Sequence, residues 1–334
     1  MKAKFKSRVD TKDHVVLGEV LPLAVPFVLV IDPSNLCNFR CRFCPTGSDD
    51  LIKKTGRYQG LLDFDLFKKI IDDLEEFDEP VKVLRLYKEG EPLIHPQFSE
   101  MVRYGKNSKK ILKVDTNTNG ALLNPKLNRQ IIEAGMDQIN ISVNGINAEQ
   151  FFKFTKTKVD FDKYVSNVRD LYENKGNCEI CIKSIKENLS VDDQSKFFDI
   201  FGDMADRIFL ESLSPAWSEF EFDGIEMKFN AGHLGQPIED REVCPYPFYI
   251  MVINSDGKTS LCIGDWQHKL GYGDTRQQSV KQIWLSDIVN DYRLAHLEMR
   301  RGEVDVCKNC QVVSHGTLDN IDKYASEIKQ RLIK

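Results

Sequence analysis

Three cysteines within eight residues constrain this 334-residue chain more than any other feature of its sequence. Cys37, Cys41 and Cys44 follow a C-x3-C-x2-C spacing in the segment CNFRCRFC. Thiolates bind soft metals, and three of them this close can hold one face of a [4Fe–4S] cubane, which ordinarily takes four cysteines. One iron would then be open for chemistry. Zinc with a remote ligand, or three unrelated thiols, are the alternatives, because a structural zinc ion needs four closed ligands.

Four more cysteines form a second set in the C-terminal third of the chain. They follow a C-x17-C-x44-C-x2-C spacing, at Cys244, Cys262, Cys307 and Cys310. Four ligands close a cubane completely, so this site would be structural or would carry electrons. A zinc ion held by four cysteines fits the same ligand count. The presence of an open cluster site upstream favours a second iron–sulfur cluster over zinc. Cys178 and Cys181 lie in a strand-like stretch, where residues three apart point to opposite faces, and we expect both in the core.

The cysteine count and the charge exclude several classes of protein. Nine cysteines are an odd number, which disfavours a complete disulfide framework, and the N-terminus lacks the features of an export signal. We therefore expect a reducing, cytoplasmic location. The formal net charge of −5 argues against a nucleic-acid partner or an anionic membrane surface. The longest apolar run, 20–31, is too short for a membrane span, which needs ~20 residues.

Strand-like and helix-like stretches alternate along the first two thirds of the chain. The apolar, β-branched stretches predict six strands, over 27–32, 81–87, 112–116, 138–143, 178–185 and 207–212. Helices are expected between them, over 64–76, 96–107, 125–134, 164–174 and 191–201. Six βα repeats predict an α/β fold in which a parallel sheet curls into a partial (β/α)6 TIM-like barrel, because a full barrel needs eight.

Polar residues follow these predicted strands, at the edge where barrel enzymes carry their active sites. The three-cysteine loop follows the first strand, and the tips of the later strands carry the segments Glu89-Gly90-Glu91-Pro92, Thr116 to Gly120, Ser142 to Gly145, Lys183, and Glu211-Ser212. Six polar tips that converge on one face support the barrel independently of the cysteines. The histidines are scattered, and we expect them at the surface or at helix caps.

We expect three regions in the chain. Residues 1–20 form a polar N-terminal extension, 21–235 form the barrel, and 236–334 form a small α+β domain. That domain begins with a hairpin over 248–262, continues with helices over 279–285 and 287–301, and ends in a helix over 319–334. This domain is too small to bury a large hydrophobic core, so we expect a metal cluster to stabilise it.

With these motifs the chain resembles the radical S-adenosylmethionine (SAM) superfamily. An aromatic residue before the third cysteine, here Phe43, is part of the hallmark of that superfamily, and it would shield the cluster from water. The resemblance implies that the open iron binds SAM. It also implies SAM contacts at the strand tips, from Glu89, Gly90, Glu91, Asn117, Asn119, Ser142, Asn144, Lys183 and Ser184. Glu89 stands where the superfamily has the first glycine of Gly-Gly-Glu-Pro, and Asn144 stands where it usually has Asp.

The C-terminal part resembles the SPASM and twitch class of auxiliary-cluster domains, and its four cysteines suffice for one cluster. The resemblance implies SAM and two [4Fe–4S] clusters as cofactors, with a flavodoxin- or ferredoxin-type electron donor. The arrangement is similar to that of a dehydrogenase that oxidises a cyclitol hydroxyl.

We therefore expect a radical SAM oxidoreductase that acts on a small polar substrate such as a sugar, a cyclitol or a nucleotide-sugar. Such a reaction would belong to carbohydrate biosynthesis. Peptide or protein modification and sugar epimerisation are the alternative reactions, and a zinc-binding interaction module is the alternative of another class. A base near the barrel mouth would take the hydroxyl proton, and the candidates are Glu211, Lys183, Tyr87, Lys88 and Asp265.

Overall fold

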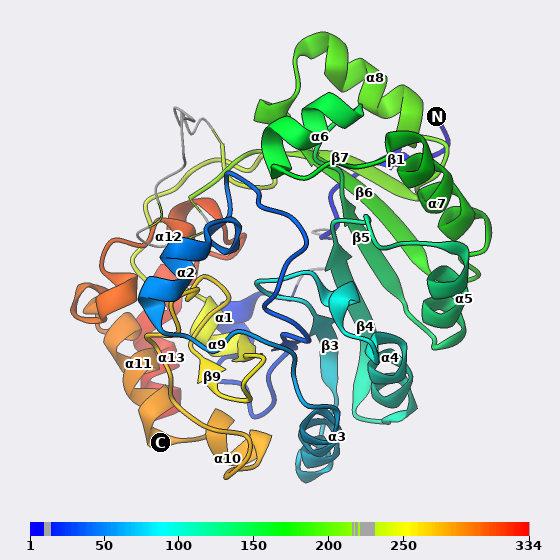
Figure 1. Cartoon of the computed structure of the whole chain (residues 1–334). Helices are drawn as coiled ribbons and strands as arrows, with labels where there is room; N and C mark the ends of the chain where they lie inside the picture. The colour runs from blue at the N-terminus through cyan, green and yellow to red at the C-terminus, as the bar shows by residue number, and fades with distance from the viewer. Residues whose placement is uncertain (10–14, 216, 218–219, 221–230, 334) are drawn as a thin grey trace.

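A single curled sheet of nine strands organises the described part of the chain (Figure 1). The structure is a computed structural model, and it describes residues 1–9, 15–215, 217, 220 and 231–333. The strand order is β1-β7-β6-β5-β4-β3-β2-β8-β9, and every pair is parallel except β8 with β9. The strands are β1 (Lys4–Phe5), β2 (Val28–Ile31), β3 (Val81–Leu86), β4 (Ile111–Thr118), β5 (Gln138–Ser142), β6 (Glu179–Ile185), β7 (Arg207–Glu211), β8 (Ile250–Ile253) and β9 (Thr259–Ser260).

The six predicted strands are β2 to β7, in a consecutive parallel order, so the partial-barrel prediction is confirmed. All four residues of β2 (VLVI) and of β8 (IMVI) are buried. Such runs are typical of parallel strands that are covered on both faces. The register places the carboxyl ends of β2 to β7 at one edge of the sheet.

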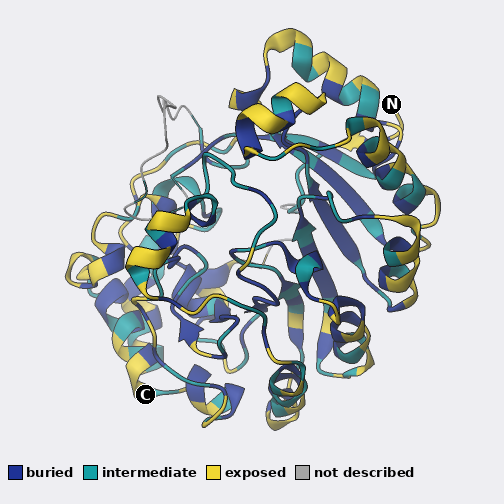
Figure 2. Ribbon diagram, viewed as in Figure 1, coloured by how far each residue is buried: buried dark blue, intermediate teal, exposed yellow. Residues whose placement is uncertain are grey.

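Helices cover the convex side of this sheet (Figure 1). The barrel helices are α3 (Phe64–Asp72), α4 (Phe98–Asn107), α5 (Pro125–Glu133), α6 (Ala148–Thr155), α7 (Phe161–Glu173) and α8 (Val191–Phe201). Most begin at a side chain that accepts a hydrogen bond from the first turn, such as Asp63 for α3, Asn124 for α5 and Ser190 for α8. Their inner faces are buried and their outer faces are exposed (Figure 2).

Two helices of the barrel region were not among the predicted elements. These are α2 (Asp49–Thr55), which follows the three-cysteine loop, and α6. Both are short, seven and eight residues, and too few apolar positions repeat in them to give a clear helical pattern. Their positions matter, because both pack around the cysteine loop described below.

The C-terminal segment continues the barrel sheet rather than forming a separate layer. The predicted hairpin is confirmed as β8 and β9, and β8 also pairs in parallel with β2, with Val28 opposite Ile250. Helices α9 (Tyr246–Tyr249), α10 (Val280–Trp284), α11 (Asp287–Leu297), α12 (Val312–His315) and α13 (Ala325–Leu332) complete this part. The second cysteine set is therefore tied to the same sheet as the first.

The N-terminal residues, expected as an extension over 1–20, take part in the fold. Strand β1 pairs in parallel with the edge strand β7, and the amides of Lys2 and Ala3 donate to the Gly202 carbonyl. Helix α1 (Leu17–Val20) lies beside α13, where Arg331 donates to the Gly18 carbonyl. The open edge of β7 supplies unpaired backbone groups, which explains why a polar segment becomes a strand there. None of the helices in the described residues combines the length and apolar character that a bilayer crossing requires.

Candidate functional site

One cavity lies at the carboxyl ends of the barrel strands, and it brings together most of the residues that the sequence singled out. The three cysteines of the first set line it, together with all ten predicted cofactor contacts and Glu211. Those contacts are Phe43, Glu89, Gly90, Glu91, Asn117, Asn119, Ser142, Asn144, Lys183 and Ser184. Of the other predicted bases, Lys88 lines the cavity, whereas Tyr87 and Asp265 do not.

The three-cysteine loop is anchored by the end of α6. The Arg40 amide donates to the Thr155 carbonyl at 2.8 Å, and the Arg42 amide donates to the Phe154 carbonyl at 3.1 Å. Phe39 beside them is 1% exposed and packs edge-on against Phe151. The loop is thus held at alternate residues, which leaves the cysteine side chains facing the cavity.

Two glycines allow backbone segments to approach the cysteine loop closely. A Cβ atom on Gly90 would lie 2.2 Å from the Ser34 carbonyl oxygen and 2.3 Å from that of Leu36. A Cβ atom on Gly47 would lie 2.2 Å from the Cys41 carbonyl oxygen. Real side chains do not tolerate such distances to backbone, so both positions require glycine. Gly90 therefore fixes the segment that leads into Cys37.

Glu91 is a buried carboxyl group with neutral partners only. It accepts hydrogen bonds from the Thr118 hydroxyl at 2.6 Å and from the amides of Asn119 and Leu93 at 2.7 and 3.1 Å. Burial raises its pKa to about 7, against the effect of these donors. A cationic group in the cavity would stabilise the ionised form of Glu91, so the residue suits a ligand with an ammonium group.

Polar side chains of β4, β5 and β6 line the cavity beyond Glu91. The Asn117 amide donates to the Ser142 hydroxyl at 3.3 Å. The Ser184 hydroxyl is buried and has no hydrogen-bond partner among the described atoms. A buried hydroxyl without a partner is costly, and a polar ligand in the cavity would satisfy it.

Glu211, at the end of β7, is surrounded by basic side chains. Its carboxylate contacts Lys183 Nζ at 2.5 Å, Arg8 Nε at 3.1 Å and His233 Nε2 at 3.1 Å. Burial alone would raise the pKa of Glu211, but His233, Lys183 and Arg8 together hold it well below its usual range. Arg8 also donates to the Tyr87 hydroxyl at 2.8 Å, so Tyr87 is held behind the cavity wall. Glu211, Lys183 and His233 line the cavity and form its polar end.

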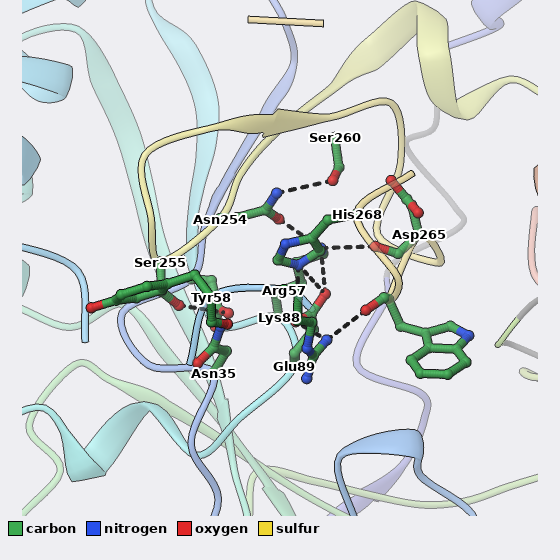
Figure 3. A network of polar contacts seen from close by, with 12 residues as sticks. Asn35, Arg57, Tyr58, Lys88, Glu89, Asn254, Ser255, Ser260, Asp265 and His268 are labelled. Atoms are coloured by element: carbon green, nitrogen blue, oxygen red, sulfur yellow. Dashed lines mark hydrogen bonds and ion pairs between the residues drawn. The ribbon is translucent and has the colours of Figure 1, made fainter. Parts of the chain in front are cut away.

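A second buried carboxylate, Glu89, lies on the side of the cavity that faces the C-terminal segment (Figure 3). Lys88 Nζ lies 2.5 Å from one of its oxygens, His268 Nε2 lies 3.0 Å away, and Arg57 forms an ion pair with the other oxygen. Burial would raise the pKa of Glu89, but Lys88, His268 and Arg57 lower it to about 2. Glu89 is therefore a permanent anion inside the protein.

Three cysteines of the second set, Cys244, Cys262 and Cys310, pack against the buried apolar cluster that contains Ile250 and Val252 of β8. Burial raises the pKa of all four thiols, and repulsion between the developing thiolates adds to the shift for Cys244, Cys262 and Cys307. Arg301 donates to the carbonyls of Cys307 and Cys310, which fixes the C-x2-C turn. Asp265, three residues after Cys262, accepts from the amides of Lys269 and Leu270, so its carboxylate organises this loop.

The donor chemistry of both sets fits iron–sulfur clusters. Burial raises the pKa of Cys37 to about 12 and also raises the pKa values of Cys41 and Cys44. Buried thiols become ligands only as thiolates, and bound metal supplies the compensating charge. No group of three or more His, Cys, Asp or Glu side chains in the described residues is arranged to hold a single metal ion.

Four residues of these networks were missed by sequence reasoning. Arg8 arrives from the N-terminal segment, Arg57 from the loop after α2, and His233 and His268 from segments far along the chain. The histidines were expected at the surface or at caps, and no spacing or neighbouring motif in the sequence marks any of the four. Among the histidines that the structure describes, His95 does act at a helix start, because its ring accepts from the Gln97 amide before α4, whereas His296 is fully buried and its ring accepts from the Cys244 amide.

Two protein-family models match the chain. The model of the radical SAM superfamily matches residues 31–188, and the model of the SPASM iron–sulfur cluster-binding domain matches residues 244–311. The chain is 33% identical over 122 residues to the tungsten-containing aldehyde ferredoxin oxidoreductase cofactor-modifying protein of Pyrococcus furiosus, covering 36% of this chain and 32% of that protein. It is 32% identical over 79 residues to the S-adenosyl-L-methionine-dependent 2-deoxy-scyllo-inosamine dehydrogenase of Niallia circulans, covering 24% and 32%. The match thus spans about a third of each relative's length.

Solved structures with the same fold come from proteins of different substrate classes. BtrN in complex with AdoMet and 2-DOIA is similar with a TM-score of 0.58 at 20% identity, over 89% of this chain and 98% of that one. SuiB of Streptococcus suis bound to the precursor peptide SuiA is similar with a TM-score of 0.62 at 14% identity, over 87% and 71%. At these identities the likeness concerns the fold.

Proposed function

Because this chain belongs to the radical SAM superfamily and carries a SPASM iron–sulfur domain, we propose that it oxidises a hydroxyl group of a small polar molecule such as a sugar, a cyclitol or a nucleotide-sugar. The supporting observation is the cavity in which the three-cysteine loop and the Lys183–Glu211–His233 group face the same space. When bound, the first cluster with SAM would supply a 5′-deoxyadenosyl radical that removes a hydrogen atom from carbon, and an auxiliary cluster would accept the remaining electron.

The residues around the cysteine loop would bind and orient the cofactors. Cys37, Cys41 and Cys44 would hold the first [4Fe–4S] cluster, and the second cysteine set would hold one auxiliary [4Fe–4S] cluster. Glu91 would face the SAM amino group, for which its buried carboxylate with neutral partners is suited. Ser142, Asn144 and Ser184 would meet the polar groups of the ribose and the carboxylate. A flavodoxin- or ferredoxin-type protein would deliver the electron that starts each turnover.

The polar end of the cavity would take the proton that a hydroxyl group loses when it becomes a carbonyl. Of the five predicted bases, Glu211, Lys183 and Lys88 line the cavity. Lys88 is held by Glu89, and Tyr87 and Asp265 are engaged elsewhere. Lys183, Arg8 and the His233 ring contact the Glu211 carboxylate and stabilise its ionised form, so Glu211 by itself is a weak proton acceptor. We therefore assign proton uptake to the Lys183–Glu211–His233 group as a unit.

Two other reactions fit the same cofactors and stay as alternatives. A peptide modifier would resemble SuiB, whose complex contains a precursor peptide. An epimerase would return a hydrogen atom to the opposite face of the carbon and would need no electron acceptor. Oxidation is favoured by the dehydrogenase name of the Niallia circulans relative and by the four-cysteine auxiliary set.

The experiment is anaerobic turnover of the reconstituted protein with SAM, a reductant and a panel of cyclitols, sugars and nucleotide-sugars. Formation of one 5′-deoxyadenosine for each ketone supports the proposal. A product with unchanged oxidation state and inverted carbon indicates epimerisation. Turnover of peptides alone would overturn the proposed substrate class.

A further inference from the structure

The Glu89 network joins segments that are far apart in the sequence (Figure 3). Lys88 and Glu89 follow β3, Arg57 follows α2, and His268 lies in the loop that begins after Cys262. The side chains of Arg57, Lys88 and Glu89 are at most 1% exposed, and that of His268 is 12% exposed. Water therefore contributes little to solvating these charges, and they depend on one another.

Arg57 contacts both cysteine-bearing loops with one guanidinium group. Its Nη2 donates to the hydroxyl of Thr46 at 3.3 Å, two residues after Cys44. Its Nη1 donates to the Trp266 carbonyl at 2.6 Å, four residues after Cys262, and also pairs with Glu89. A planar guanidinium with several fixed donors can bind three acceptors at once, which a lysine ammonium at this position would not reproduce.

Lys88 reinforces the same junction from the barrel side. Its ammonium donates to Glu89 at 2.5 Å, to the Asn254 side chain at 2.7 Å and to the Asp265 carbonyl at 3.2 Å. All three protons of the ammonium therefore have acceptors. Asn254 follows β8, and Asp265 comes three residues after Cys262. Lys88 therefore connects the end of β3 to the segments before and after β9 and Cys262.

His268 completes the network under backbone strain. Its φ angle is +56°, a left-handed conformation that residues other than glycine seldom adopt. In that conformation its Nε2 lies 3.0 and 3.2 Å from the two Glu89 oxygens. The strain is tolerated because the surrounding contacts over-determine the loop, and the contact of His268 with Glu89 is one of them.

We infer that Arg57 and Glu89 are positioning residues that lock the loop after Cys262 against the loop after Cys44, and thereby fix the placement of the auxiliary cluster site relative to the SAM site. This inference deepens the proposed function, because it matters for catalysis only if both cysteine sets carry clusters. Neither residue needs to touch the substrate for the lock to operate.

The experiment compares Arg57→Gln and Arg57→Lys with the unmodified protein, all reconstituted anaerobically and loaded with SAM. The matched control is Arg207→Gln, which removes a partly exposed partner of Glu179 at the opposite end of the strands. Hydrogen exchange of the amides over 262–270 measures the lock directly. The magnetic interaction between the two reduced clusters, measured by pulsed EPR, reports their relative placement.

We expect Arg57→Gln to speed exchange over 262–270 about tenfold or more, because each lost hydrogen bond to a charged group accounts for roughly that factor. The cluster interaction should change in Arg57→Gln, and Arg57→Lys should restore part of both signals, while Arg207→Gln leaves both unchanged. Exchange within about twofold of the unmodified protein, or an unchanged cluster interaction, would overturn the inference. If Arg57→Gln fails to fold, His268→Gln gives the same two readings. Formation of 5′-deoxyadenosine by the unmodified protein tests the proposed function separately.

Discussion

Replacing Glu211 with glutamine tests whether the polar end of the cavity is held together by one buried carboxylate. The substitution keeps the shape of the side chain and removes its charge. Glu211 is 4% exposed and contacts Lys183, Arg8 and His233 at 2.5 to 3.1 Å, so two permanent cations lose their counter-ion. Breaking a buried pair by removing one partner costs ~3–5 kcal/mol. Arg8 and Lys183 retain 19% and 13% exposure, and the amide oxygen keeps a hydrogen bond, so we expect about 2–3 kcal/mol here.

The assay is native-state hydrogen exchange of the β6 and β7 amides, because a protein with bound clusters does not unfold in two states. A loss of about 2–3 kcal/mol corresponds to roughly 30- to 150-fold faster exchange. Glu179→Gln is the matched control, because Glu179 pairs with Arg207 at 2.6 Å on the same strands but is 29% exposed. An exposed pair of this kind contributes about 0–1 kcal/mol.

A second variant distinguishes the effect of the unpaired cations from a general loss of packing at this site. Lys183→Met in the Glu211→Gln background removes one of the stranded cations and should recover part of the protection. The reasoning would be refuted if Glu211→Gln exchanged no faster than Glu179→Gln. It would also be refuted if the double variant lost the full sum of the two single effects.

Three other perturbations probe the two cysteine sets and the carboxylate beside them. The affinity for SAM should rise as the pH increases from about 6 to about 8, because Glu91 ionises through a pKa of about 7 and its anion favours the cationic amino group of SAM. Equilibrium dialysis measures this affinity, and Glu91→Gln should remove its dependence on pH. Gly90→Ala should abolish assembly of the first cluster, because a Cβ atom there would lie 2.2 Å from the Ser34 carbonyl oxygen. The iron content after reconstitution measures cluster assembly, and a normal iron content would contradict the prediction. Cys310→Ser should leave SAM cleavage in place but stop ketone formation, as measured by chromatography of both products, and continued ketone formation would remove the auxiliary set from the mechanism.

The barrel and the lining of the cavity could be predicted because their signals are local. Each strand of the barrel is a short apolar run, and each functional segment, such as Glu91 after β3 or Ser142 at the end of β5, follows its strand directly. In a parallel sheet all such tips meet at one edge, so local order along the chain is sufficient to collect them.

The two ionic networks could not be predicted, because their members are distant in sequence. Arg57 and the Trp266 carbonyl are separated by 209 residues, and Arg8 and Glu211 are separated by 203. These contacts exist because β1 adds to the edge of β7 and because β8 extends the sheet beside β2. Neither strand pairing has a sequence signal that distinguishes it from an N-terminal extension or a separate domain.

The most direct test of the central claim is the amount of 5′-deoxyadenosine that the anaerobically reconstituted, chemically reduced protein makes from SAM. We expect several equivalents from the unmodified protein and none from Cys41→Ala, which should retain the iron of the second set and lose that of the first. Absence of the nucleoside from the unmodified protein, or equal amounts from both proteins, would contradict a SAM-cleaving cluster held by Cys37, Cys41 and Cys44.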